Sequence, residues 1–131
     1  MTGDIEPGAV FELPANLAQP PGRAFQDNPP VRDHRWVLIV SSPADCADEG
    51  CDNVLGVLLS TRMDKCGPMD VPVLHPNGGV EENSIAQSDI VLTIDRRAIS
   101  GPTNGPRYRG TVLDDTFLQL QALLRERLAL N

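Results

Sequence analysis

The apolar pattern of this chain changes period near residue 113, and that change limits the folds open to it. Between residues 113 and 131, apolar side chains recur every three or four positions, which is the spacing of one face of a helix. The stripe consists of Leu113, Phe117, Leu120, Leu124 and Leu128. We expect Asp114 or Asp115 to cap the start of this helix. A helix with one apolar face must bury that face, and the preceding sequence offers only strands as partners.

Six segments upstream of the helix have the composition of β-strands, because they are rich in branched apolar residues and are bounded by turn residues. They span residues 8–14, 35–41, 54–61, 71–75, 84–94 and 109–112. Segment 54–61 is almost continuously apolar, so we expect it to be buried on both faces. Short strands followed by one terminal helix predict an α+β fold, with a small, strongly bent antiparallel sheet or barrel capped by the helix.

The connecting segments are polar or rich in glycine and proline. Segments 44–53 and 99–109 have the composition of loops, and HPNGG at 75–79 indicates a tight turn in which Asn77 and the glycines take positive φ. The proline-rich stretch 15–33 is long for a loop inside a compact domain, so it is either functional or an excursion without a role. A length of 131 residues predicts a single domain over 1–131 that contains this insertion.

Charge and composition narrow the class of partner. The formal net charge is −7, which argues against a general nucleic-acid binder because phosphate recognition rests on basic surfaces. However, all the basic residues except Lys65 are arginines, and a local arginine cluster can still bind phosphate. The opening MTGDIEPGAVF lacks the features of a secretory signal, and no apolar run approaches the roughly 20 residues of a membrane span. We therefore expect a cytoplasmic protein without a membrane contact.

Several residues that could carry other chemistry have simpler interpretations. Four potential zinc ligands occur, but their spacing is looser than in compact structural sites, and we expect free thiols and no metal or cofactor. They are Cys46, Cys51, Cys66 and His75. No nucleophile elbow and no phosphate-binding loop is present.

Polar residues at strand ends remain as the candidate site. If segments 35–41 and 54–61 pair in antiparallel fashion, Arg35 at the start of one meets Ser60 and Thr61 at the end of the other. A guanidinium and one or two hydroxyls that converge on one point can bind a phosphate. The alternative is a surface ion pair of Arg35 with Asp33, with the hydroxyls bonded to strand-end carbonyls.

The order of these segments resembles the MazF/PemK toxins of bacterial type II toxin-antitoxin systems. The likeness is carried by HRWVLIVS, VLLSTR, V-x-V-L, SDIVLTIDRR and RGTV leading into the C-terminal helix, and it covers roughly residues 8–130. The resemblance implies an SH3-like β-barrel that forms a homodimer and is neutralised by a cognate antitoxin. It also implies metal-independent endoribonuclease activity on single-stranded RNA, in which the 2′-hydroxyl attacks the adjacent phosphorus.

The resemblance assigns roles to individual positions. Arg35 matches the arginine of the family's H/G-R-P motif, and Ser60 or Thr61 matches its hydroxyl after the third strand, so these three are the expected catalytic residues. Residues expected to contact RNA are Arg62, Gln87, Asp89 and Arg97. The chain departs from the family pattern at Trp36, where the family has proline, and at Ile90, where it has glutamine.

Two other functions remain open on the sequence alone. One is a non-enzymatic toxin or interaction module on the same barrel, like the CcdB-type toxins that bind DNA gyrase, and its mark would be an exposed apolar patch around Leu118, Leu123 and Leu130. The other is a barrel that binds a small ligand.

Overall fold

The structure is a computed structural model that describes residues 5–14, 34–48, 50–100 and 107–128. The proline-rich insertion predicted at 15–33 lies outside the described residues, and the single-domain assignment stays a prediction.

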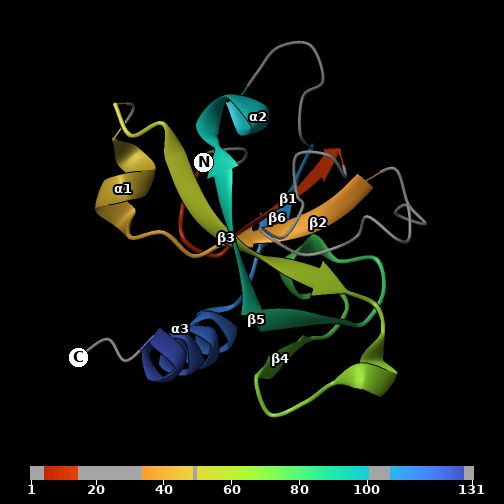
Figure 1. Ribbon diagram of the computed structural model, residues 1–131. Helices are drawn as coiled ribbons and strands as arrows, with labels where there is room; N and C mark the ends of the chain where they lie inside the picture. The colour runs from red at the N-terminus through yellow and green to blue at the C-terminus, as the bar shows by residue number, and fades with distance from the viewer. Residues whose placement is uncertain (1–4, 15–33, 49, 101–106, 129–131) are drawn as a thin grey trace, which may run out of the picture.

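Within the described residues, six strands form one antiparallel sheet in the order β4-β5-β3-β2-β1-β6 (Figure 1). The strands are β1 (Ala9–Pro14), β2 (His34–Ile39), β3 (Asn53–Ser60), β4 (Asp70–Val73), β5 (Ser84–Asp95) and β6 (Arg107–Thr111). The terminal helix α3 (Asp114–Leu128) packs against this strongly curled sheet. The predicted α+β fold, with a bent antiparallel sheet and a C-terminal helix, is confirmed.

The curl has local causes in the strand pairing. The register between β3 and β5 shifts between Val57 and Leu59, and the register between β1 and β6 shifts between Val10 and Phe11. Such bulges bend a strand and increase its twist. At Gly56 of β3, a Cβ atom would lie only 2.8 Å from the Ile94 side chain of the neighbouring strand β5. The missing side chain of Gly56 therefore leaves room for Ile94.

Both faces of the sheet are packed. One core cluster includes Phe11, Val37 and Leu58, and the other includes Leu38 and Val57 together with the buried face of α3. Strand β3 contributes to both clusters, which confirms the predicted burial of segment 54–61 on its two faces. With both faces buried, the sheet can place functional side chains only at its edges and at its strand ends.

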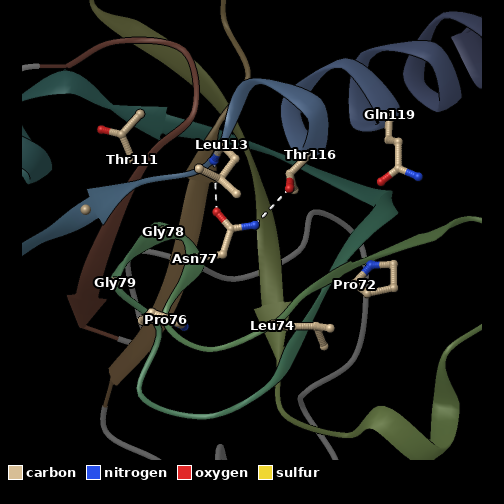
Figure 2. A pocket seen from close by; sticks show the side chains of 11 residues that line it. Pro72, Leu74, Pro76, Asn77, Gly78, Gly79, Thr111, Leu113, Thr116 and Gln119 are labelled. Atoms are coloured by element: carbon tan, nitrogen blue, oxygen red, sulfur yellow. Dashed lines mark hydrogen bonds between the residues drawn. The ribbon is translucent and has the colours of Figure 1, made fainter.

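Asn77 ties the β4–β5 connection to the start of α3 (Figure 2). It lies in the 3-10 turn η3 (Asn77–Gly79), where its Oδ1 accepts the Leu113 N–H at 2.9 Å and its Nδ2 donates to Thr116 Oγ1 at 2.8 Å. The predicted turn at 75–79 is present, but positive φ is taken by Gly78 and Gly79, at 66° and 75°. Asn77 acts through its side chain instead.

Three sequence predictions were wrong in detail. Leu113 is 66% exposed because α3 begins one residue later, whereas Leu120 and Leu124 are buried as predicted. Segment 44–53 is not all loop, because α1 (Pro43–Ala47) overlaps its first residues. Ser42 caps the start of this helix, and its Oγ accepts the Asp45 N–H at 3.2 Å. Segment 99–109 overlaps α2 (Arg96–Ser100) at one end and β6 at the other.

We predict that Asn77→Ala lowers the free energy of unfolding by about 2 kcal/mol, since it removes the acceptor of the Leu113 N–H and the partner of the Thr116 hydroxyl. Urea denaturation followed by circular dichroism measures this loss. Asn77→Asp keeps the acceptor and should lose less. Equal losses in the two variants would contradict the role assigned to Oδ1.

Candidate functional site

The start of β2 and the end of β3 lie at the same rim of the sheet, on the right of Figure 1. The pairing aligns Val37 with Leu58 and ends with Trp36 aligned with Leu59, so Arg35 and Ser60 each lie one residue beyond the last aligned pair. Residues directly opposite in an antiparallel pair project to the same face, with their Cβ atoms about 5 Å apart. Arg35 shares the face of Val37, and Ser60 shares the face of Leu58, so both project to the same side of the sheet at this rim.

Arg35 stands at the boundary between the core and the rim. Its partner on β1 is Leu13, which is fully buried, and Arg35 itself is partly buried. Burial lowers the pKa of the Arg35 guanidinium from its ordinary value. An arginine starts so far above neutral pH that it stays protonated, so the rim holds a fixed positive charge on a rigid strand.

The chain turns directly after β3, and Ser60 is part of that turn. Its Oγ accepts the Arg62 N–H at 3.1 Å. Because this bond uses the oxygen only as an acceptor, the Ser60 O–H can still donate to a second group. Thr61, the next residue, is also partly exposed.

Arg62 forms a surface ion pair beside the rim. Its Nε and Nη2 donate to Asp64 at 3.2 and 3.3 Å, and these bonds raise the pKa of the Arg62 guanidinium. Both side chains are more than 60% exposed. Exposed pairs of this kind are weak and screened, so Arg62 can exchange Asp64 for another anion.

Gln87 shares the face of Arg35 and Ser60. Strand pairing aligns Ser60 with Ile85, and Gln87 lies two residues farther along β5, so it projects to the same side. Gln87 is partly exposed. Asp89 belongs to β5, but its side chain lies outside the described residues.

Arg97 does not join this group. It lies in α2, just after the pairing of Asn53 with Asp95, at the opposite end of β3 from Ser60. Strand β3 is eight residues long, so its two ends are roughly 23 Å apart. Arg97 instead pairs with Asp95 at 3.0 Å, and its hydrogen bonds lower the pKa of that carboxyl.

Sequence reasoning overlooked the role of Arg96, the neighbour of Arg97. Its guanidinium donates to three backbone carbonyl oxygens, those of Asp45 at 2.6 Å, Cys46 at 2.9 Å and Cys51 at 2.8 Å. Carbonyls at a helix end lack partners within the helix, so Arg96 satisfies the end of α1 and holds segment 45–51 against β5. The sequence signal was only an arginine directly after a strand.

The sequence analysis also missed a cluster around Arg109, which lies on the other face of the sheet at the same rim. Arg109 forms an ion pair with Glu12, and its guanidinium carbon lies 4.8 Å from the centre of the Trp36 ring. Glu12 and Trp36 are direct partners in the β1–β2 pairing. The three side chains thus form one unit, which we call the Trp36 cluster.

Within the described residues, no group of three or more histidine, cysteine or acidic side chains could hold a metal ion. Cys46 is buried, Cys51 is partly exposed and Cys66 is exposed. The four formal zinc ligands considered from the sequence are not assembled. Within the same residues, no helix is long and apolar enough to cross a membrane.

A separate groove lies between β4, η3, β6 and the first turns of α3 (Figure 2). Its walls include Pro72, Leu74 and Leu113, and no charged residue lines it. A phosphate would find no cation there, so the rim is the better phosphate site. Of the leucines expected to form an apolar patch, Leu118 is 60% exposed, Leu123 packs partly against the core and Leu130 lies outside the described residues.

Comparisons with known proteins agree with the fold. No protein-family model matches the sequence, and no curated protein matches it. Among solved structures, the MazE-MazF complex of Deinococcus radiodurans aligns with a TM-score of 0.66 at 15% identity, over 96% of each chain. An endoribonuclease in complex with its cognate antitoxin, from a mycobacterial species, aligns with a TM-score of 0.66 at 20% identity, over 96% of each chain.

Mycobacterium tuberculosis toxin MazF-mt6 aligns with a TM-score of 0.55 at 21% identity, over 76% of this chain and 90% of the other. These likenesses span nearly all of this chain in the first two cases, although few residues are identical. The chain therefore has the fold of the MazF toxins, and the resemblance noted in the sequence is confirmed at that level.

We predict that Arg96→Lys lowers the free energy of unfolding by about 2 kcal/mol, because an ammonium cannot reach three carbonyls in the planar fork of a guanidinium. Arg97→Lys is the matched control, since Arg97 is 90% exposed and holds only a surface pair. Urea denaturation of both variants checks this. Similar losses at the two positions would contradict the role of Arg96.

The cysteines should differ in reactivity. Burial raises the pKa of the Cys46 thiol, although the nearby Arg96 opposes this, so Cys46 stays neutral and shielded. A raised folded pKa means that this group's contribution to stability is lost as the pH rises through that value. We expect iodoacetamide to label Cys66 first and Cys46 only after unfolding, as followed by peptide mass spectrometry. Equally fast labelling of both in the folded protein would refute this.

Proposed function

We propose that this protein is the toxin of a toxin-antitoxin system and cleaves single-stranded RNA without a metal ion. The proposal is supported by the position of Arg35 and Ser60, which flank the last aligned pair of β2 and β3 on one face of the sheet, at a rim where the backbone turns away. A fixed cation beside a hydroxyl donor is suited to a phosphate that gains negative charge. The likeness to a structure named as an endoribonuclease supports the same reaction.

The proposed chemistry is transesterification within the RNA. The 2′-oxygen attacks the adjacent phosphorus and loses its proton, while the bond from phosphorus to the 5′-oxygen breaks and that oxygen gains a proton. The products are a 2′,3′-cyclic phosphate and a 5′-hydroxyl end. Arg35 neutralises the charge that builds on the non-bridging oxygens, and the O–H of Ser60 or Thr61 donates a directional hydrogen bond to one of them.

The remaining residues of the rim bind the RNA around that phosphate. Arg62 exchanges its exposed Asp64 partner for a neighbouring phosphate, and the Gln87 amide contacts the strand on the same face. Asp89 contributes from the same strand, β5. Arg97 lies at the far end of β3, so we assign it no contact with the reacting phosphate.

The partners follow from the same proposal. One related structure holds an endoribonuclease with its cognate antitoxin, and we propose that a cognate antitoxin likewise blocks this rim in the cytoplasm. A homodimer is the proposed assembly. The exposed Leu74, Leu113 and Leu118 are apolar surface that such contacts could bury. With a net charge of −7, these contacts must depend more on apolar burial than on attraction to a basic surface.

The decisive assay incubates the purified protein with mixed-sequence RNA in EDTA. We expect discrete cuts that end in cyclic phosphates, a rate about a hundredfold lower for Arg35→Ala, and a rate about tenfold lower for Ser60→Ala. Arg125→Ala is the charge-matched control, since Arg125 is exposed on α3, away from the rim.

Intact RNA at high protein concentration would count against the nuclease and favour the non-enzymatic, CcdB-like alternative. Equal activity of the Arg35→Ala and Arg125→Ala variants would leave a nuclease but displace its centre from the rim. Circular dichroism of each variant separates lost chemistry from lost folding.

A further inference from the structure

We propose that Trp36 is a stacking platform for an unpaired nucleobase that flanks the cleaved phosphate. This inference rests on the proposed function and names a base-binding subsite for it. It is carried by the Trp36 cluster, in which an indole at the rim is clamped by a charged side chain.

The indole is held in a fixed position. The Arg109 guanidinium lies over the ring at 4.8 Å, which is within the range of a cation–π contact. Arg109 is itself fixed by its ion pair with Glu12, and these two side chains are only 27% and 18% exposed. An aromatic surface that is already immobilised loses little conformational entropy when a ligand stacks on it.

The cluster is poorly explained as a stabilising device. Arg109 Nε is buried, and within the described residues it has no hydrogen-bond partner. Burying a polar atom without a partner is unfavourable, and a well-packed apolar residue would avoid that cost. An arginine kept under these conditions indicates that the position of the ring above it matters.

Trp36 and the candidate phosphate site are neighbours in the chain and across the sheet. Trp36 directly follows Arg35, and its partner Leu59 directly precedes Ser60. Successive side chains on a strand point to opposite faces, so one nucleotide cannot place its phosphate on Arg35 and its base on Trp36 without crossing the rim. The base on Trp36 therefore belongs to the nucleotide next to the cleaved one.

The chemistry of the subsite defines its ligand. Trp36 packs partly against the second core cluster, and its exposed part offers an aromatic surface rather than a hydrogen-bonding pattern, so it accepts any base but only one that is not paired in a duplex. The subsite thus selects for single strands. It also compensates for an acidic protein, because stacking does not depend on net charge.

Trp36 is the only tryptophan of the chain, so its fluorescence reports on this subsite alone. We titrate the unaltered protein in EDTA with a 2′-O-methyl oligonucleotide of mixed sequence, which binds but lacks the attacking hydroxyl. Stacking predicts saturable quenching of the emission. A fully abasic strand of the same length carries the same phosphates without bases and should not quench, and a duplex of the same sequence should quench weakly.

Variants test the contribution to affinity, measured by anisotropy of a labelled 2′-O-methyl strand. We expect Trp36→Leu to weaken binding by about tenfold and Trp36→Phe to retain most of the affinity, since base stacking on an aromatic ring is typically worth this much. Leu55→Ala removes an exposed apolar side chain from the part of β3 far from Ser60 and is the control.

The outcomes separate this inference from the proposed function. Cleaved RNA together with unchanged fluorescence, or with equal quenching by the abasic strand, overturns the stacking subsite and leaves the nuclease intact. Intact RNA with base-dependent quenching supports the subsite and rejects the reaction. A protein that neither cuts RNA nor changes its emission with any strand refutes both.

Discussion

The register between β2 and β3 is the constraint on which the proposed site depends. It pairs Trp36 with Leu59 on one face and leaves Arg35 and Ser60, each one residue beyond that pair, on the other face. A slip by one residue would turn every side chain of β2 to the opposite face and would separate these pairs. The site is thus a property of strand pairing more than of any local motif.

Burial on both faces is what fixes this register. Val37 and Leu38 follow one another on β2, and each is fully buried in a different core cluster. An alternative register would have to repack both clusters, at a cost comparable to the free energy of folding of a small domain. Polar residues at the strand ends then inherit their positions from the core, which is how a surface site becomes rigid without a loop of its own.

The sequence was sufficient for the elements that follow simple periodicities. Six strands and the terminal helix were predicted with ends within a few residues, and the antiparallel pairing of β2 with β3 that the sequence analysis assumed is present. The short helix α1 was missed, although Ser42 followed by a proline is a recognisable start signal. Segment 44–53 was instead judged by its polarity.

What the sequence could not supply were the contacts between residues far apart in the chain. Arg96 bonds carbonyls about fifty positions away, and Arg109 meets Glu12 and Trp36 from the other end of the chain. Arg97, which we expected to contact RNA, follows the end of β5 that pairs with the start of β3, and so lies at the far end of β3 from Ser60. An arginine's role depends on which strand ends its neighbours reach, and only the sheet topology determines that.

These arginine contacts also limit how an acidic protein could attract the RNA that we propose as its substrate. Arg96 is bound to backbone carbonyls and Arg109 to Glu12, so these two cations add little to the electrostatic field around the protein. A phosphate approaching from a distance meets a net charge of −7, and long-range attraction is therefore absent. In the function that we propose, recognition therefore depends on short-range contacts, namely the hydrogen bonds of Arg35 and Ser60 and stacking on Trp36. Such contacts require a close fit of a single strand. An acidic protein that depends on them would therefore select single-stranded RNA over other nucleic acids.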